Sequence, residues 1–367
     1  MERLINGIQQ VGIGVADAQL AFAWYKKHLG FDTVVFEDIA TASLMQRYTG
    51  GQIQQRYAVL AMNMQGGGGL EIWQYTNRKP SAPAQPLRLG DRGIYAIKIK
   101  CKNVKVLHAQ WCKEGVIDIV SSIATDPSGK KHFFIRDPFD NLFQLIDDDY
   151  WFQNKKGLTG GVCGAVIGVS DLDKALLFYE QVPDYKTVHY LAQDVSGDLK
   201  DLPGGDRICN RAIIKHVPLF RGAFSTLLGP STIELIEVAG TKNIFENRYW
   251  GDLGFIHVCY DICSMKTHEI ICKTNNHPLT INSIGSFEMG EAGGQFSYNE
   301  DPDGTLIEYV ETHKVPIIKS LGLYLNLGKR KNIKALPRWV VKCIGLSKKS
   351  LQLSPVNTKG LKLNPPV

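Results

Sequence analysis

The chain has 367 residues, of which 44% are hydrophobic and 21% are charged. This composition excludes collagen-like, intrinsically disordered and disulfide-rich miniprotein classes, and the length is sufficient for two domains. The net charge of +6 is unevenly placed, since the segment from Lys314 onward holds 12 Lys or Arg and no Asp or Glu, which leaves −6 on residues 1–313. Because this acidic body lacks the basic face that phosphate binding needs, we expect no nucleic-acid ligand.

The sequence carries no signal for a membrane-spanning helix, for export or for an oxidising compartment. No apolar run approaches the roughly 20 residues of a membrane-spanning helix, and residues 1–10 contain no basic stretch followed by a hydrophobic one. The eight cysteines include no CxxC pair, which indicates reduced and mostly buried thiols. We therefore expect a cytoplasmic protein.

The first predicted elements are a strand, a helix and three further strands. The run at residues 10–15 is short and rich in β-branched residues, which is typical of a strand. Asp17 is a suitable N-cap for a helix over residues 18–28, and Gly30 would end that helix. Three strand-like runs follow, at residues 31–36, 56–62 and 70–75. The last two are separated by a glycine-rich turn at residues 66–69.

An internal repeat extends this pattern along the chain. The sequence VAD at residues 15–17, followed by two aromatic residues, recurs as VSD at residues 169–171, at a constant offset of 154. Within each half, a second unit opens with a glycine-led strand at residues 93–96 or 254–257. That unit closes with an Asp-Pro turn and a strand, DPFDNLFQ or DPDGTLIE. The order therefore occurs four times, and the sequence predicts an α+β fold of four βαβββ units.

The four units predict three regions of the chain: an N-terminal module at residues 1–152, a C-terminal module at residues 158–313 and a basic extension at residues 314–367. Basic and apolar residues are interleaved in the extension, with Trp339 as an anchor, which fits an amphipathic segment on an anionic membrane surface or on an acidic protein partner. The alternative is a segment that folds back over the acidic body. Residues after Ser350 have the composition of a frayed terminus.

The order of the units and three motifs, QVGIGVAD, GFIHV and EDPDGTLIEYV, resemble the vicinal oxygen chelate (VOC) superfamily. This superfamily includes glyoxalase I, extradiol dioxygenases and bleomycin-resistance proteins. The resemblance spans about residues 5–313. It implies two modules with cup-shaped mixed sheets, in which two units pair to form each cup. Each unit would supply two possible metal ligands, one residue from its first strand and one from its last strand.

The resemblance identifies eight possible ligand positions. The first-strand positions hold Gln10, Ala96, Gly164 and His257, and the last-strand positions hold Glu71, Gln144, Glu234 and Glu308. Pairing of unit one with unit four, as in eukaryotic-type glyoxalase I, would collect one complete set: Gln10, Glu71, His257 and Glu308. The other cup would be degenerate, because Ala96 and Gly164 cannot bind a metal. Pairing within each module would instead leave a three-ligand site of Glu234, His257 and Glu308.

The complete set implies a definite chemistry. Three oxygen donors and one imidazole suit one divalent ion, such as Zn²⁺, Ni²⁺, Co²⁺, Mn²⁺, Mg²⁺ or Fe²⁺. The resemblance implies a metal-dependent lyase, isomerase or epimerase that stabilises an enediolate of a small vicinal-oxygen substrate. In that mechanism Glu308 is the base, Glu71 is a ligand or alternate base, and Gln10 and His257 are fixed ligands. The alternative for both glutamates is a solvated sheet face opposite their apolar neighbours.

Two other functions stay open at this stage. An extradiol dioxygenase uses two histidines and one carboxylate for Fe(II), whereas His257 is the one histidine at a ligand position. A bleomycin-resistance-like protein would keep the cup for ligand binding without a metal. The positions that bind glutathione in glyoxalase I hold Gly14, Tyr75 and Leu253, so the resemblance does not extend to that substrate. Several aromatic residues near the motifs could line a pocket or pack in the core: Trp73, Tyr75, Tyr260 and Phe255.

Overall fold

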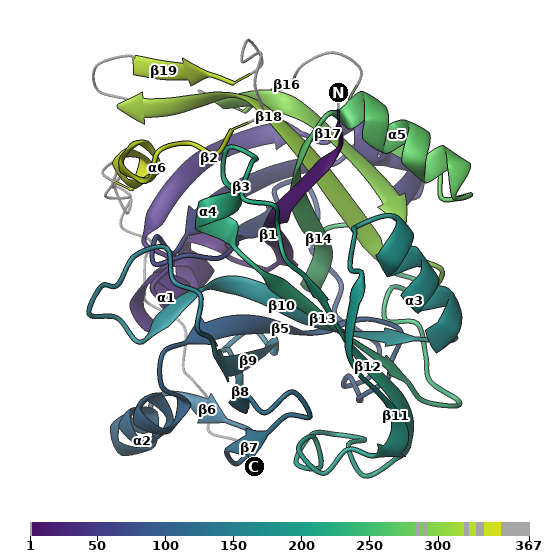
Figure 1. Cartoon of the computed structure of the whole chain (residues 1–367). Coiled ribbons are helices and arrows are strands. Elements are labelled where there is room, and N and C mark those ends of the chain that lie inside the picture. The colour runs from purple at the N-terminus through teal and green to yellow at the C-terminus, as the bar shows by residue number, and fades with distance from the viewer. Residues whose placement is uncertain (1, 284–286, 290–291, 319–322, 328–333, 346–367) are drawn as a thin grey trace.

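The computed structural model describes residues 2–283, 287–289, 292–318, 323–327 and 334–345. Its strands form two curled mixed sheets, one above the other in Figure 1, with helices along their outer faces. The expected α+β fold of paired βαβββ units is therefore confirmed. No helix among the described residues has the length and apolar character needed to cross a bilayer.

Each of the four predicted units is present. Unit one comprises β1 (Leu4–Gly14), α1 (Ala18–Leu29), β2 (Thr33–Thr41), the 3-10 helix η1 (Ser43–Tyr48), β3 (Gln55–Met62) and β4 (Gly69–Tyr75). Unit two comprises β5 (Gly93–Cys101), α2 (Val104–Glu114), β6 (Asp118–Ile119), β7 (Ala124–Thr125), β8 (Lys131–Arg136) and β9 (Leu142–Asp147). Unit three comprises β10 (Thr159–Val169), α3 (Leu172–Gln181), β11 (Thr187–Val195), β12 (Ile208–His216), α4 (Ser225–Leu228) and β13 (Ser231–Glu237). Unit four comprises β14 (Gly254–Cys263), α5 (Met265–Thr274), β15 (Ile281–Asn282), β16 (Phe287–Met289), β17 (Ala292–Glu300) and β18 (Leu306–Ile318).

Each sheet combines strands from both halves of the chain. In the first sheet, units one and four meet where β1 pairs antiparallel with β14. In the second sheet, units two and three meet where β5 pairs antiparallel with β10. Within a unit the first and last strands run parallel, as β1 does with β4 and β14 does with β18. The pairing of unit one with unit four is thus confirmed, and pairing within each module is not found among the described strands.

Local sequence signals explain where the first helix begins and ends. The Asp17 carboxylate accepts a hydrogen bond from the backbone N–H of Leu20 at 2.9 Å. It thereby pairs one of the first-turn N–H groups that have no carbonyl partner within the helix. Gly30 adopts a left-handed conformation with φ of 74° and donates its N–H to the carbonyl of Tyr25, which ends α1. The predicted helix over residues 18–28 is therefore confirmed and is one residue longer.

The strand predicted at residues 31–36 begins later and ends later than expected. It spans Thr33–Thr41 as β2, because its whole length pairs with β3, out to Thr41 opposite Gln55. The two other predicted strands of this unit match β3 and β4 to within one residue at each end.

The main hydrophobic core is shared by all four units. One cluster of buried side chains includes Ile13 of unit one, Ile97 of unit two, Ile167 of unit three and Val258 of unit four. All eight cysteines are free, and five of them are buried, as expected. Because the core and both sheets draw on both halves, the modules at residues 1–152 and 158–313 remain a proposal about repeats in the sequence.

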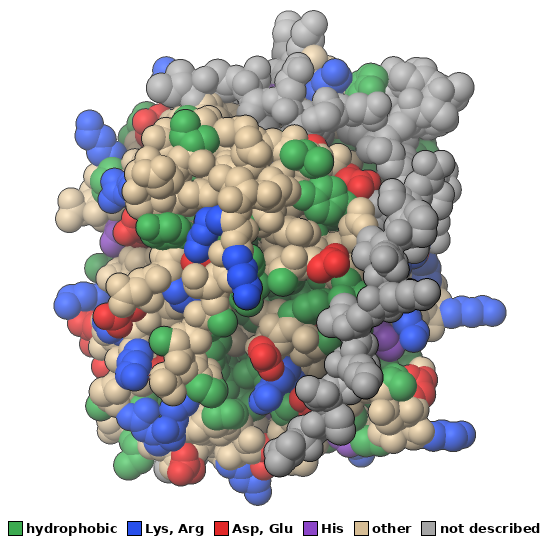
Figure 2. Space-filling model, turned by 180° about the vertical axis from the view of Figure 1, so that it is seen from behind, with side chains coloured by type: hydrophobic (Ala, Val, Ile, Leu, Met, Phe, Trp, Pro, Cys, Tyr) green, Lys and Arg blue, Asp and Glu red, His purple; other side chains and the backbone are tan. Residues whose placement is uncertain are grey.

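The described part of the basic extension packs on the body. Strand β19 (Leu323–Asn326) pairs with β18, and helix α6 (Arg338–Ile344) buries Val340 and Val341 against a cluster that contains Met62. Folding back is therefore confirmed for α6, while Trp339 is 68% exposed. The predicted frayed terminus after Ser350 lies outside the described residues. On the face shown in Figure 2, Lys and Arg side chains are scattered among acidic and hydrophobic ones.

Candidate metal centre

Four adjacent strands of the first sheet each supply one residue to a single buried site. Gln10 lies on β1, Glu71 on β4, His257 on β14 and Glu308 on β18, and the sheet order is β18-β14-β1-β4. The two parallel pairs of strands are joined by the antiparallel pair β1–β14, so the four side chains converge from both sides of this junction.

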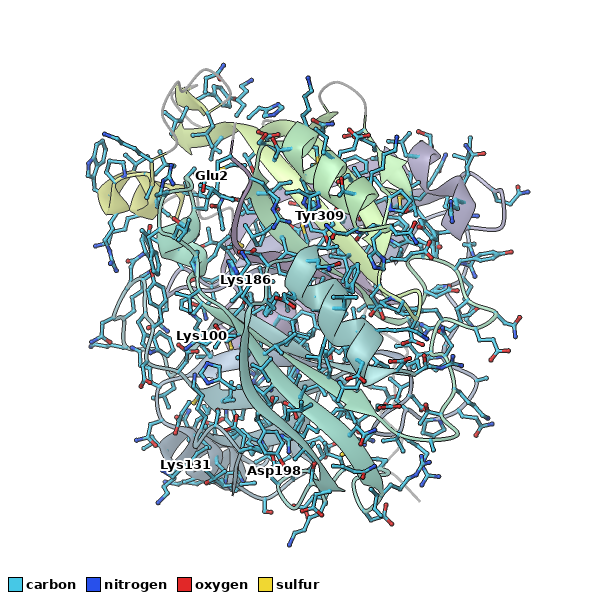
Figure 3. All side chains as sticks on the ribbon, turned by 45° about the vertical axis from the view of Figure 1, so that its right-hand side comes forward. Glu2, Lys100, Lys131, Lys186, Asp198 and Tyr309 are labelled. Atoms are coloured by element: carbon cyan, nitrogen blue, oxygen red, sulfur yellow. The ribbon has the colours of Figure 1, made fainter. Side chains whose placement is uncertain are left out.

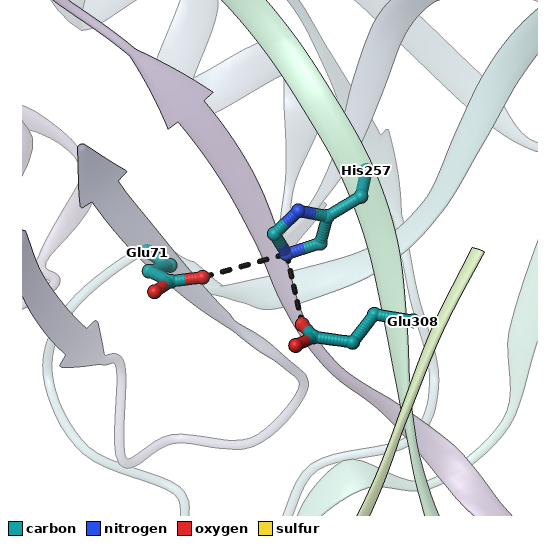
Figure 4. Close-up of side chains that lie close together, drawn as sticks. All are labelled: Glu71, His257 and Glu308. Carbon is teal, nitrogen blue, oxygen red and sulfur yellow. Dashed lines mark ion pairs between the residues drawn. The ribbon is translucent and has the colours of Figure 1, made fainter. Parts of the chain in front are cut away.

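The four side chains lie within contact distance of one another. His257 Nε2 is 3.4 Å from Glu71 Oε2 and 3.0 Å from Glu308 Oε2 (Figure 4). Gln10 Nε2 is 3.3 Å from Glu71 Oε2 and 3.4 Å from Glu308 Oε2. The ligand atoms of Glu71, His257 and Glu308 all fall within 4.8 Å of one another. The structure therefore brings together all four residues predicted from the sequence.

The donor set and its spacing fit a divalent ion. Donors about 2.1 Å from one ion lie roughly 3.0–3.4 Å apart, and His257 Nε2 lies at such distances from Glu71 Oε2 and Glu308 Oε2. Gln10 Oε1 is buried and has no hydrogen-bond partner among the described residues, and neither ring nitrogen of His257 has one of suitable geometry. Buried polar atoms are normally satisfied, so a cation among them would supply a missing partner.

No lysine or arginine among the described residues balances the charges of the site. Neither Glu71 nor Glu308 forms an ion pair with a lysine or arginine in the described part of the chain, and both are buried, at 7% and 6% exposure. Burial alone would lower the pKa of His257, but the carboxylates of Glu308 and Glu71 outweigh it and raise that pKa to about 9. Burial opposes ionisation of Glu308, and the imidazole of His257 lowers its pKa below the ordinary value. The alternative of a solvated sheet face is therefore wrong for both glutamates.

Residues that were not predicted from the sequence complete this site. Gly12 lies opposite His257 in the β1–β14 register, and a Cβ there would come within 2.5 Å of the imidazole Cε1. The Tyr298 ring packs edge-on against His257 at 5.5 Å, and Tyr298 lies opposite Glu308 in the β17–β18 pair. A glycine two residues after a ligand position is the one signal that the sequence offered.

The second sheet holds a different arrangement at the equivalent place. Ala96 and Gly164 offer no donor, as expected, and a Cβ on Gly164 would meet the carbonyl oxygen of Thr232 at 1.9 Å. The centre of the cup is filled by Lys98, whose Nζ lies 2.6 Å from Gln144 Oε1 and 2.5 Å from Glu234 Oε2. The predicted three-ligand alternative fails because Glu234 belongs to this other sheet.

Arg211 extends the charge network of the second cup. It lies 2.7 Å from Glu234 and makes two contacts, of 2.6 and 2.8 Å, with Asp198, which follows β11 and is labelled in Figure 3. Asp198 also lies 3.2 Å from His132 Nε2. The Arg211 and His132 partners lower the pKa of Asp198 despite its burial. The sequence analysis missed Lys98 and Arg211, because both lie outside the positions compared.

The aromatic residues near the motifs serve mainly in packing. Trp73 and Tyr75 pack with Trp250 and Ile256 in a small cluster, with the Trp73 and Tyr75 rings edge-to-face at 4.6 Å. Tyr260 and Phe255 belong to the main core. The core alternative is thus the one that the structure supports for all four.

Comparisons with known proteins agree with this fold. The sequence model of the Glyoxalase/Bleomycin resistance protein/Dioxygenase superfamily matches residues 7–145. Glyoxalase I from Zea mays is similar in structure, with a TM-score of 0.53, 13% identity, and coverage of 84% of this chain and 92% of that chain. A dioxygenase-like protein from Bacillus subtilis has a TM-score of 0.51 and 11% identity, covering 84% of this chain and 86% of that chain. No curated protein matches the sequence.

At these identities the structural likeness shows the fold alone, with its two curled mixed sheets. Residues 7–145 carry the sequence signature of a Glyoxalase/Bleomycin resistance protein/Dioxygenase superfamily domain, the type also described as a VOC domain.

Proposed function

We propose that the chain is a metal-dependent VOC enzyme, a lyase, isomerase or epimerase of the glyoxalase I type. Gln10, Glu71, His257 and Glu308 would hold one divalent ion, and the substrate would be a small molecule with oxygens on neighbouring carbons. The convergence of these four buried side chains, with no lysine or arginine partner among the described residues, is the observation that supports the proposal. A bound divalent ion would supply Lewis acidity toward the two substrate oxygens.

The protein's own residues would move the proton. The carboxylate of Glu308 would take it from the carbon next to a substrate carbonyl and return it to the neighbouring carbon. Tyr298 and Cys259 hydrogen-bond Glu308 and favour its ionised form, which is the form a base needs. Glu71, on the opposite side of His257, would act as a ligand or as the alternate base (Figure 4).

Burial of the site would serve the same chemistry. His257 is fully buried, and the carboxylates of Glu71 and Glu308 are nearly so, which strengthens electrostatic interactions and limits access of water to a reactive intermediate. Gly12 gives the imidazole its room, and Tyr298 fixes its orientation by edge-on packing.

The test begins with metal analysis of protein purified without chelators, for which we expect about one divalent ion per chain. A panel of 2-oxoaldehyde adducts, 2-hydroxy ketones and acyl-CoA epimers then identifies a substrate, with and without added metal. On that substrate, Glu308→Gln should lower kcat by about 10² or more, the usual scale of general-base catalysis. Glu180→Gln, on the exposed face of α3, is the matched control and should retain full activity.

Two results would contradict the proposal. Full activity of Glu308→Gln would move the base elsewhere, with Glu71 as the next residue to change. Tight binding of a panel member to metal-free protein, without turnover of any member, would favour the non-catalytic binding function.

A further inference from the structure

Helix α6 of the basic extension presents an aromatic side chain and several cations to solvent. Trp339 is 68% exposed, whereas the next two residues, Val340 and Val341, are buried and hold the helix on the body. Residues 334–345, which contain this helix, include three basic side chains and no acidic one. The face of α6 that does not pack on the body therefore combines a large apolar side chain with positive charge.

The cations of this segment are not neutralised by the acidic body in the described part of the chain, because none of them forms an ion pair with a carboxylate. Arg338 instead donates to the backbone carbonyls of Trp151 and Phe152, and its Cζ lies 5.0 Å from the centroid of the Phe152 ring. Lys334 and Lys342 are exposed. The positive charge of α6 is thus able to attract an external anion.

The loop between β12 and α4 exposes further apolar side chains. Val217 is 51% exposed, Leu219 is 65% exposed and Phe220 is 38% exposed. Phe220 adopts a left-handed conformation with φ of 54°, which is rare for a bulky residue and persists only where neighbouring contacts hold it. The Tyr150 ring supplies such a contact, since it stacks on Phe220 with 5.6 Å between ring centroids. The structure therefore fixes this loop with its apolar side chains in solvent.

The loop and α6 are neighbours. The backbone N–H of Leu336, just before α6, donates to the carbonyl of Ala223 at 3.0 Å, and α6 lies beside α4 in Figure 1. The segment 150–152 contacts both, through Tyr150 to the loop and through Phe152 to α6. We call the exposed residues of the two segments the docking surface: Val217, Leu219, Phe220, Arg338, Trp339 and Lys342.

We propose that the docking surface binds this protein to an anionic lipid bilayer. Tryptophan, phenylalanine and leucine beside basic residues are typical of segments that lie at the membrane–water interface. The extension from Lys314 onward adds charge of the same sign, with 12 Lys or Arg and no Asp or Glu. Arg221, in the same loop, pairs with Glu2 at 2.9 Å and is not counted among the cations that would bind lipid.

The exposed apolar side chains favour a bilayer over an acidic protein as the partner. An acidic protein surface would satisfy the cations alone, whereas Leu219 and Trp339, each more than half exposed, also require an apolar phase. A bilayer with anionic headgroups offers both within a few ångströms. The proposal does not depend on the metal centre, because none of the docking residues belongs to it.

The experiment is co-sedimentation of the full chain with vesicles of phosphatidylcholine alone, or of an equal mixture of phosphatidylcholine and phosphatidylglycerol. We expect binding to the mixed vesicles, much weaker binding to the neutral ones, and loss of binding as added salt screens the charges. Trp339→Ala and Leu219→Gln should each lower the partition coefficient about fivefold or more. Lys342→Gln should lower it about fivefold, the usual effect of one basic residue near an anionic membrane.

Matched variants on other elements test whether these effects are local. Leu191→Gln changes a leucine on β11 that is 57% exposed, and Lys273→Gln removes one exposed charge from α5. Both elements lie on the other side of the molecule from α6 in Figure 1. Both variants should bind the mixed vesicles as the wild type does. Circular dichroism confirms that all five variants are folded.

Four results would overturn the proposal. Failure of the wild type to sediment with mixed vesicles would reject membrane binding, and equal binding to neutral vesicles would reject recognition of anionic lipid. Binding of Trp339→Ala and Leu219→Gln at the wild-type level would show that the charge of the extension acts without the docking surface. Binding to soluble polyglutamate but not to mixed vesicles would indicate an acidic protein partner instead.

Discussion

The two cups of this protein solve the same electrostatic problem in different ways. Each cup buries at least one carboxylate on the last strand of a unit. In the second cup, Lys98 and Arg211 neutralise the carboxylate of Glu234. In the first cup, Glu71 and Glu308 contact His257 and Gln10, and neither pairs with a Lys or Arg among the described residues. Buried charges need a partner of opposite sign. The comparison shows that the same scaffold can neutralise a buried carboxylate with its own lysine, or can lack such a lysine and leave space for an external cation.

One pair of equivalent strand positions contributes to this difference. Lys98 lies opposite Gln144 in the parallel pair of unit two, as Gly12 lies opposite Glu71 in unit one. Gly12 leaves room for the imidazole of His257, whereas Lys98 extends into the centre of its cup. A glycine at this position leaves room for a candidate metal ligand, whereas a lysine at the equivalent position completes an ionic network.

The largest expected effect compares one histidine from each cup. His257→Ala should reduce metal affinity by more than about 100-fold, because loss of a direct ligand exceeds the 10–100-fold cost of removing an outer partner. His132→Ala, which removes a buried histidine paired with Asp198 in the second cup, should retain about one ion per chain. Metal analysis after gel filtration measures both, with circular dichroism to confirm folding. Equal loss of bound metal from the two variants would show that the two cups do not differ in metal binding.

The next effect concerns stability and falls on the second cup. Lys98→Met should destabilise the protein by about 3–5 kcal/mol, because it leaves the fully buried Glu234 with one cationic partner fewer. The double variant Lys98→Met/Glu234→Gln should recover part of that loss, since it also removes the buried negative charge. Urea denaturation measures both. A loss below about 1 kcal/mol for the single variant would show that the ion pair is not what closes this cup.

A third effect depends on pH and contrasts two equivalent strand positions. Asp261 lies opposite Val310 in the first sheet, where Lys100 lies opposite Ile146 in the second. Burial raises the pKa of Asp261 to about 7, against the hydrogen bonds from Asn6, Thr312 and Gln9.

Because the folded state holds the proton more tightly than the unfolded chain, whose aspartate pKa is about 3.9, this group's contribution to stability is complete below about pH 4 and is lost as pH rises through 7. The loss would be about 4 kcal/mol between those limits. Asp261→Asn should remove this pH dependence, so the variant gains on the wild type between pH 5 and pH 8 in urea denaturation. Parallel pH profiles for the two proteins would contradict the assignment.

The smallest effect should be the same for both sheets. Asp17 caps α1 of the first sheet's unit one, and Asn103 caps α2 of the second sheet's unit two, each accepting a backbone hydrogen bond. Replacing either cap by Ala should cost about 1 kcal/mol of unfolding free energy. Thermal denaturation provides the measurement. A difference well above this figure between the two variants would show that the sheets do not unfold together.

The sequence was sufficient for the unit order and for the four candidate ligands. Helix caps such as Asp17 and Gly30 act locally, so they can be read without tertiary contacts. His257 and Glu308 could be located because the repeats align their strands with those of a known family. Lys98 and Arg211 could not, because their role depends on side-chain length and on partners in another unit. The contribution of α4 and α6 to the apolar pocket that Gln10 lines was not predicted either, since it depends on how distant segments pack.

The exchange of units between the sheets also constrains how the chain can fold during synthesis. Strand β1 ends at Gly14, and its partner β14 begins only at Gly254. At about 5–20 residues per second, the ribosome needs roughly 12–48 s to make the intervening segment. During that interval one edge of β1 has no native neighbour, and unpaired strand edges invite intermolecular pairing. The first sheet can therefore close only late in translation, whereas the second sheet, whose units are neighbours in sequence, can form earlier.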